Sequence, residues 1–398
     1  MGGNKPPIFI EQGGSYMDSR QRFLDIAHFK RPGDIYIGKH FQWFWSETLK
    51  RWVNEGAPAT ILNEKGGRSI DEFFGFDRME KIPIFNDLVP FGKHADGPYI
   101  LPVFPFFERK ILKEENDRQV YINEEGVTVR IDKNDTNAMP QWLEYPVKDK
   151  KTWETYKKRL DPNEPARFPA YWKDYIRCTK GRDYPIGLYA GSLFGFPRAW
   201  MGLEPLVIAM YDNPMLVEDM MEYCMYFFME FYKKVLPEID VDYVYFWEDM
   251  AYKTGPLISP AFMKKFMVPR YKKMTEYIRS HNIDIIMIDN DGNIDEMIPV
   301  WLESGINAPY PLEVAADVDA VKIRKKYGKE LVLIGNIDKR ALIKGKEAID
   351  TELDYKIPYL ISTGGYFPQI DHSVPPQVSY ENWQYFLKKL RSYASLSK

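Results

Sequence analysis

Short runs of apolar residues, separated by longer segments with helical spacing, dominate the chain from about residue 184 onward. Such runs, bounded by turn residues, predict strands that are buried on both faces. The runs lie at 186–190, 242–247, 283–288 and 331–335, with a late one starting at 365. Proline follows Asn213 and Ser259, as is common at the first turn of a helix, where its missing N–H costs nothing. Strands that alternate with helices predict a parallel sheet, so the expected fold class is α/β, and specifically a (β/α)8 TIM barrel.

The amino-terminal half departs from this rhythm. The first 17 residues predict a flexible arm, and Asp18 or Ser19 then caps a short helix that precedes a first strand at 34–38. From about 80 to 148 prolines interrupt the chain, and residues 119–131 alternate around a Glu-Gly turn, which predicts a β-hairpin. This stretch has too little apolar content to fold alone. We therefore expect one barrel domain over 18–398 that carries residues 80–148 as an insertion.

Composition narrows the class of protein. A net charge of −3 over 398 residues offers no basic face for nucleic acid, and the chain has no 18-residue apolar run that would span a membrane. Two cysteines and a start without a signal peptide favour a reducing cytoplasm. No GxGxxG or GxxxxGK[ST] motif follows a strand, which removes the usual reason to prefer an open nucleotide-binding sheet. The oligomeric state, a homo-oligomer included, stays open.

Polar side chains follow four of the predicted strands, where a barrel places its active site. Glu248 follows one strand, Asp289 and Asp291 the next, Asn336 another, and His372 the last. Two nearby carboxylates either raise one pKa, which gives a general acid or base, or bind a cation together. With the imidazole of His372 and the carboxylate of Glu248 they form a candidate site for a divalent metal. The run 289–293 is also ordinary Asx-turn chemistry, and His372 is equally a histidine that fixes a loop.

Aromatic residues make up 15% of the chain. They fill a core or, when gathered at a pocket, suit a flat apolar ligand. Trp43 and Trp45 follow the first predicted strand, as does His40, and a small-residue loop leads to Phe194 after the strand at 186–190. The expected substrate-binding residues are all placed just after strands. They are His40, Trp43, Trp45, Phe194, Tyr252 and Asn336.

Several stretches together resemble the uroporphyrinogen decarboxylase superfamily, which includes corrinoid-dependent methyltransferases. They are SRQRFLDIAHFKRPGDIYIG, WEDMAYKTGPLISPAFMKKFMVPRYKKM, DNDGNIDEMIPVWLESGINAPYPLE, GNIDKRALI and the tail IDHSVPPQVSYENWQYFLKKL. The resemblance runs from about residue 18 to the end and implies a barrel with its active site at the carboxyl ends of the strands.

The resemblance also separates the branches. The decarboxylase branch binds the carboxylates of a tetrapyrrole with clustered arginines near the amino terminus. In this sequence, aromatic residues around Trp43 take the place of those arginines. The methyltransferase branch binds zinc through a His-x-Cys pair and a later Cys, and Asp289, Asp291 and His372 hold those places. Two carboxylates and an imidazole make a harder site than thiolates, which disfavours methylation of a thiol.

What this resemblance implies is the opposite half-reaction, in which a methyl group leaves a methoxylated, aromatic donor for the cobalt of a corrinoid protein. Cobalamin would be carried by that partner protein, and zinc or a protonated carboxyl would assist the departing oxygen. Asp289, Asp291 and His372 would bind the metal or act as acid, with Glu248 as a further ligand. The alternative is a metal-independent decarboxylase of a smaller acid, and a binding protein without chemistry is the third possibility.

Overall fold

The computed structural model describes residues 18–38, 43–62, 68–84, 102–134 and 139–396. The arm expected over residues 1–17 lies outside these residues. A parallel five-stranded sheet has the strand order β1-β6-β7-β10-β11, and a second parallel pair joins β12 to β13. The strands are β1 (Glu80–Lys81), β6 (Ile186–Gly191), β7 (Tyr243–Trp247), β10 (Ile286–Asp289), β11 (Ala308–Tyr310), β12 (Leu333–Ile334) and β13 (Tyr366–Phe367). The predicted α/β class with a parallel central sheet is confirmed.

Backbone hydrogen bonds extend the order of the strands beyond these two sheets. The N–H of Val332 donates to Asn307 O at 2.9 Å, which joins β12 to β11. At the other end, Gly38 and Asp77 form a parallel bridge, which places the segment 35–38 beside β1. The ring of Tyr36 in that segment meets Phe367 of β13 edge to face, with centroids 5.8 Å apart. The hydrogen bonds of the described residues do not join these last two segments, so closure into an eight-stranded barrel stays a prediction.

Helices follow most of these strands and pack on the sheet. Asp18 caps the first one, as predicted, by accepting a hydrogen bond from the N–H of Gln21. The longer helices are α1 (Ser19–Ala27), α2 (Ser46–Asn54), α5 (Trp172–Thr179), α7 (Leu203–Asp212), α8 (Pro214–Val235), α10 (Val268–Arg279), α12 (Ala320–Tyr327), α14 (Lys346–Thr363) and α15 (Tyr380–Leu396). The shorter ones are α3 (Arg68–Phe74), α4 (Lys150–Tyr156), α6 (Gly195–Met201), α9 (Pro260–Phe262), α11 (Ile298–Glu303) and α13 (Lys339–Lys344).

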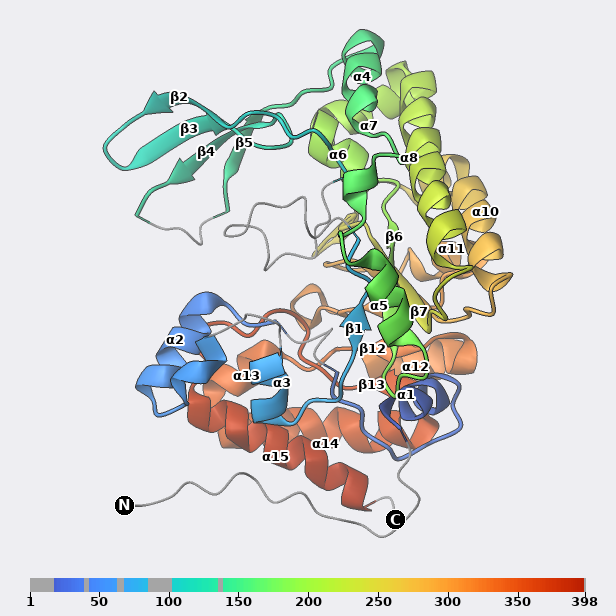
Figure 1. Ribbon diagram of the computed structural model, residues 1–398. Coiled ribbons are helices and arrows are strands. Elements are labelled where there is room, and N and C mark those ends of the chain that lie inside the picture. Colours follow the sequence, from blue (N-terminus) through green and yellow to red (C-terminus); the bar gives the residue numbers. More distant parts are fainter. Residues whose placement is uncertain (1–17, 39–42, 63–67, 85–101, 135–138, 397–398) are drawn as a thin grey trace.

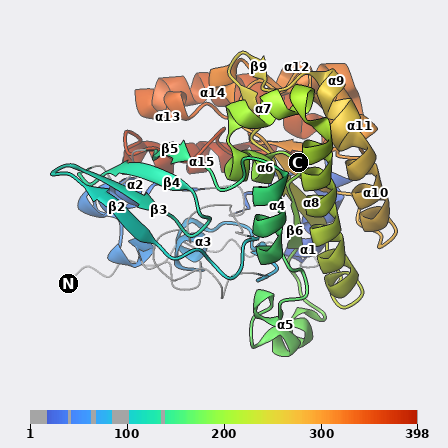
Figure 2. The same cartoon turned by 90° about the horizontal axis from the view of Figure 1, so that it is seen from above.

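A separate antiparallel sheet comes from the region expected to be an insertion. It contains β2 (Lys110–Glu114), β3 (Arg118–Ile122), β4 (Thr128–Asp132) and β5 (Gln141–Glu144) in that order. The expected Glu-Gly turn joins β3 to β4, and Gly126 has the positive φ of 81° that favours glycine in a tight turn. Figures 1 and 2 show this sheet on one side of the molecule, with α8 and α10 on the opposite side. The structure thus contains more than a lone hairpin, and its status as an insertion in a barrel stays a prediction.

A single large apolar core lies between the parallel strands and their helices. The strands β6, β7 and β10 are buried along their whole length, which explains their continuous apolar sequence. Tryptophans contribute some of the largest buried side chains, among them Trp52, Trp200 and Trp383. Much of the aromatic content therefore serves packing. Within the described residues, no helix is long and apolar enough to cross a membrane.

The turn between β3 and β4 gives a testable pH dependence of stability. Burial, helped by the neighbouring Glu124, raises the pKa of Glu125 to about 7. The folded state therefore favours the protonated carboxyl, and this term weakens folding as the pH rises from about 4.5, the usual pKa, through 7. We expect Glu125→Gln to raise the free energy of unfolding by roughly 1–2 kcal/mol at alkaline pH and to leave it unchanged at acidic pH. Thermal unfolding of the wild type and the variant across this pH range measures the change in stability. An equal effect of the substitution at acidic and alkaline pH would contradict the prediction.

Candidate active site

Acidic residues and one histidine gather where the parallel strands end. Asp289 is the last residue of β10, Asp249 stands two residues after β7, and His372 follows β13. Parallel strands bring their carboxyl ends to one edge of the sheet. Asp291 connects the group, because its Oδ2 lies 3.5 Å from Nε2 of His372 and its backbone N–H donates to Oδ1 of Asp249 at 3.4 Å. Asp291 and His372, which the sequence places in one cluster as metal ligands or acids, form an ion pair in the structure.

Asp289 and Asp249 lie deeper than this pair and repel each other. Burial raises the pKa of Asp289 well above its usual value, and the nearby carboxylates of Asp249 and Asp291 raise it further. Burial and Asp291 also raise the pKa of Asp249 to about 6, although Trp247 donates an N–H to its Oδ2 at 3.0 Å. Like charges held close in a poorly solvated place cannot all be ionised. The cluster therefore retains protons at a pH where ordinary carboxyl groups have lost them.

The pair formed by Asp291 and His372 is the part of the cluster that a ligand can reach. Their side chains are 40% and 36% exposed, whereas Asp289 is only 6% exposed. The hydrogen bond to Asp291 raises the pKa of His372 against the opposing effect of burial. A histidine with a raised pKa is protonated over more of the neutral range and can donate a proton. In this cluster, His372 is therefore partly exposed and favoured in its protonated form.

Two cations that sequence reasoning missed also belong to this group. Lys81 ends β1, and its Nζ lies 5.1 Å from the ring centroid of Tyr245 and lowers the pKa of Asp289. Arg198 on α6 donates to the carbonyl of Asp249 at 2.6 Å, and its guanidinium lies over the ring of Trp247. Asp249 itself was within reach of sequence reasoning, because it stands beside Glu248 at a strand end. Lys81 was not, since β1 has only two residues and falls at the border of the expected insertion.

The aromatic stretch before α2 comes to the same edge of the structure. The N–H of Val374 donates to Trp43 O at 2.8 Å, and the N–H of Trp45 donates to Val374 O at 3.3 Å. These bonds place Trp43 and Trp45 next to the segment that carries His372. The Trp43 ring also lies 5.8 Å from Nζ of Lys81, and Trp45 is 39% exposed. His40 lies outside the described residues.

Glu248 and Phe194 have a different environment from the one expected. The carboxylate of Glu248 is fully buried and accepts hydrogen bonds from several donors. These donors are Ser192 Oγ at 2.9 Å, the N–H groups of Leu193, Phe194 and Gly195 at 2.6, 2.7 and 2.8 Å, and the Tyr271 hydroxyl. The Phe194 side chain is also fully buried. Glu248 therefore holds the loop before α6 in place and has no lone pair directed to the exposed pair.

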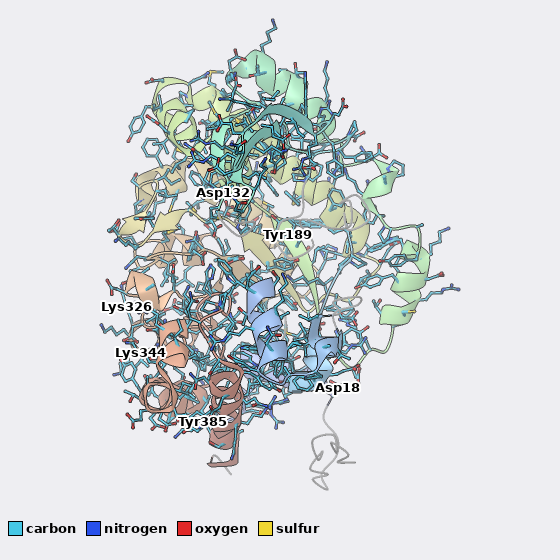
Figure 3. The ribbon with its side chains drawn as sticks, turned by 90° about the vertical axis from the view of Figure 1, so that its left-hand side faces the viewer. Asp18, Asp132, Tyr189, Lys326, Lys344 and Tyr385 are labelled. Atoms are coloured by element: carbon cyan, nitrogen blue, oxygen red, sulfur yellow. The ribbon has the colours of Figure 1, made fainter. Side chains whose placement is uncertain are left out.

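Asn336 and Tyr252 contribute little to the cluster. Asn336 is fully buried with a positive φ of 70°, and its amide bonds the backbone of Ala320, Leu312 and Val318 at 2.7–2.8 Å. It locks loops together. Tyr252 on the short hairpin of β8 (Ala251–Tyr252) and β9 (Gly255–Pro256) is 62% exposed. Another tyrosine, Tyr189 of β6, which is labelled in Figure 3, is buried. Tyr189 packs on Tyr245 with ring centroids 5.4 Å apart.

Comparison with known proteins decides the family. The model of the uroporphyrinogen decarboxylase (URO-D) family matches residues 119–393, which is more than half of the chain. The chain belongs to the URO-D family. A solved methyltransferase from Methanosarcina mazei has a similar fold, with a TM-score of 0.57 and 12% sequence identity over 96% of this chain and 99% of that one. None of the curated proteins compared with the chain matches it.

This URO-D member does not offer a zinc site in the part of the chain that the structure describes. There, no three His, Cys, Asp or Glu side chains form a group that could hold a metal ion. Asp291 and His372 are paired with each other, and Glu248 is saturated by its own donors. The residues expected to bind zinc therefore do not fit a metal, and we derive no catalytic step from one.

Replacing Glu248 tests its role as a structural acceptor. Gln at this position would direct an amide NH₂ at the N–H groups of the loop, leaving buried donors unsatisfied. We expect Glu248→Gln to lower the free energy of unfolding by about 2–4 kcal/mol in a urea titration. Glu230→Gln, which removes a surface ion pair with Lys233, serves as the control and should change it by less than about 0.5 kcal/mol. Equal effects of both variants would refute the structural role.

The ion pair at the exposed edge has its own test. Because Asp291 stabilises the imidazolium, Asp291→Asn should lower the pKa of His372, which an NMR titration of the histidine rings measures. A raised histidine pKa stabilises the folded state at acidic pH, and this contribution is lost as the pH rises through that pKa. The wild-type protein should therefore be stabilised relative to the variant below, and not above, the pKa of His372. An unchanged pKa in the variant would show that the pair is not formed in solution.

Proposed function

We propose that the chain is a methyltransferase that moves a methyl group from a methoxylated, aromatic donor to the cobalt of a partner corrinoid protein. Membership of the URO-D family and the similar fold of a methyltransferase support the reaction class. The observation that carries the proposal is the partly exposed pair of Asp291 and His372, 3.5 Å apart, in a segment whose Val374 N–H bonds the backbone of Trp43.

The chemistry of an aryl methyl ether explains why this pair matters. Its leaving group is a phenolate, whose conjugate acid has a pKa of about 10, as for tyrosine. A reduced corrinoid, when bound to the partner, supplies the strong nucleophile. The chain has to bind the donor and place a proton on the departing oxygen. His372, which Asp291 keeps protonated, donates that proton to the departing oxygen. Asp291 holds the imidazole in position for this step.

The surrounding residues assign the remaining tasks. Trp43 and Trp45 supply flat apolar surface for the aromatic ring of the donor, next to the segment of His372. Lys81 favours the ionised form of Asp289, and Arg198 fixes the carbonyl of Asp249. The partner protein would approach the same edge, because the methyl group and the proton donor must both be reachable there. This partner, its cobalamin, and the location of the reaction in the cytoplasm belong to the proposal.

A direct assay tests the activity. The purified chain, cob(I)alamin and a set of methoxybenzenes and methoxybenzoates are combined, and methylcobalamin is followed by its absorbance. We expect methylcobalamin to form, and His372→Gln to slow its formation about 100-fold, the usual contribution of a general acid. His281→Gln is the control, because His281 bonds the carbonyl of Tyr277 at the end of α10, and its rate should stay within about twofold.

Failure has a defined form. If no donor yields methylcobalamin, the proposed activity is wrong. Release of carbon dioxide from an acid in the absence of any corrinoid would support the alternative decarboxylase, to which the name of the family points. Binding of a ligand without formation of methylcobalamin or carbon dioxide would indicate a binding protein without catalytic activity.

A further inference from the structure

A buried carboxylate immediately precedes His372 and is not used by the mechanism above. Asp371 is fully buried. Its Oδ2 accepts the N–H of Val314 at 3.0 Å, and its Oδ1 accepts the N–H of Lys339 at 3.1 Å. Its own N–H donates to Ile337 O at 2.8 Å. One side chain and its backbone therefore fasten the segment of His372 to the loops that follow β11 and β12.

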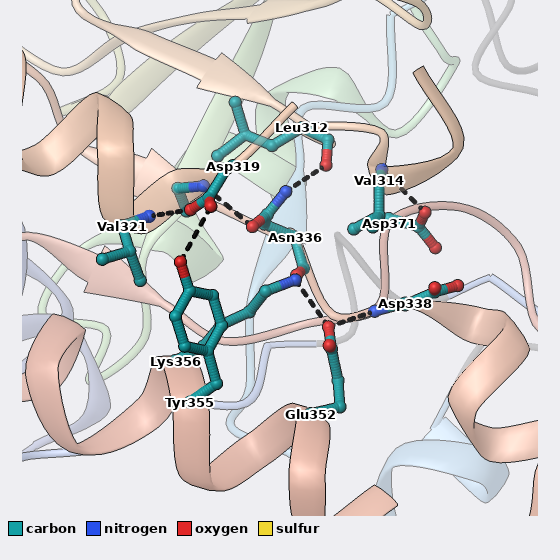
Figure 4. A network of polar contacts seen from close by, with 12 residues as sticks. Leu312, Val314, Asp319, Val321, Asn336, Asp338, Glu352, Tyr355, Lys356 and Asp371 are labelled. Atoms are coloured by element: carbon teal, nitrogen blue, oxygen red, sulfur yellow. Dashed lines mark hydrogen bonds and ion pairs between the residues drawn. The ribbon is translucent and has the colours of Figure 1, made fainter. Parts of the chain in front are cut away.

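The loop after β12 is itself held in place by a buried ion pair on α14. Lys356 on α14 is 3% exposed, donates to the carbonyl of Asn336 and pairs with Glu352 at 2.5 Å. Glu352 accepts the N–H of Asp338 at 2.8 Å. Figure 4 shows this network, with Asp371 at Val314 on one side and Glu352 at Asp338 on the other. Lys339, which donates to Asp371, is the first residue of α13, and the preceding residue Asp338 is held by Glu352.

The chain is fixed again just after His372. Thr48 donates its hydroxyl to Val374 O at 2.7 Å, and the N–H of Val374 donates to Trp43 O at 2.8 Å. His372 thus lies between two anchored residues, Asp371 and Val374. These anchors restrict the backbone on both sides of His372, so the place of the imidazole does not depend on the 3.5 Å contact with Asp291 alone.

We propose that Asp371 is a positioning residue, which sets the place of His372 relative to Asp291 by joining three loops at the carboxyl edge of the sheet. The inference rests on the proposed function for its effect on catalysis, and on the contacts alone for its effect on the geometry. A small displacement of His372, the proton donor, lowers the rate of the chemical step more than it weakens the binding of the methyl donor.

A matched pair of variants separates positioning from general loss of stability. Asp371→Ala removes two hydrogen bonds to backbone N–H groups. Asn307→Ala also removes two bonds to backbone, from the N–H of Ile286 at 2.9 Å and to Asp284 O at 2.8 Å, at the opposite ends of β10 and β11. Asp371→Asn, which keeps one acceptor, is the milder variant should Asp371→Ala fold poorly.

The first readout is kinetic. We expect Asp371→Ala to lower kcat by about tenfold or more with KM within about twofold, and Asp371→Asn to fall between it and the wild type. Asn307→Ala should leave kcat within about twofold of the wild-type value, even where it lowers thermal stability as much as Asp371→Ala does. Equal losses of kcat in the two alanine variants would overturn the proposal.

The second readout does not need activity. Long-range ¹H–¹⁵N spectra resolve the rings of the five histidines, and His372→Gln assigns the signal of His372. The ring signals of His372 should shift in Asp371→Ala and in Asp371→Asn, and stay in place in Asn307→Ala. An unmoved signal in the Asp371 variants would refute the positioning role. Because this outcome is independent of methyl transfer, failure of the proposed function alone leaves the inference standing.

Discussion

The arrangement of the site depends on one electrostatic constraint, the gathering of carboxylates at the end of a buried parallel sheet. Asp249 follows β7, and Asp289 and Asp291 stand at the end of the neighbouring strand β10. Burial, together with the repulsion between the carboxylates, raises the pKa values of Asp249 and Asp289, while the more exposed Asp291 lies 3.5 Å from His372. The order of the strands therefore places a group of carboxyl groups with raised pKa values next to a partly exposed ion pair.

Other polar groups at this edge have a structural role, because they form hydrogen bonds to the backbone of the loops around the carboxylates. Glu248, Asn336 and Asp371 are each fully buried, and each bonds to two or more backbone groups outside its own segment. Irregular chain at the end of a sheet leaves N–H and C=O groups without partners, and buried polar side chains satisfy them. Several of the loops at this edge are therefore held by buried side chains as well as by backbone contacts. This suits catalysis, which needs groups fixed before the substrate arrives.

Much of the fold could be predicted, because periodicity reports burial directly. The strands β6 and β7 and the helices α1 and α8 lie where their patterns indicate them, and Asp18 caps α1 as expected. The short strands β1 and β11 were missed, since two or three residues carry no period. In the site, the positions of Asp291 and His372 after strands placed both at one edge of the sheet, but their ion pair was not predicted. The structural use of Glu248 could not be foreseen, because a carboxylate after a strand looks the same whether it meets solvent or a cage of N–H groups.

The central claim is that His372 protonates the departing oxygen, and the dependence of the rate on the leaving group tests it most directly. Methyl transfer to cob(I)alamin would be compared for wild type and His372→Gln, with methoxybenzene and with its nitro-substituted analogue, whose phenolate needs little help to leave. The account predicts a large loss of rate for methoxybenzene and almost none for the nitro compound. An equal loss with both donors would contradict it.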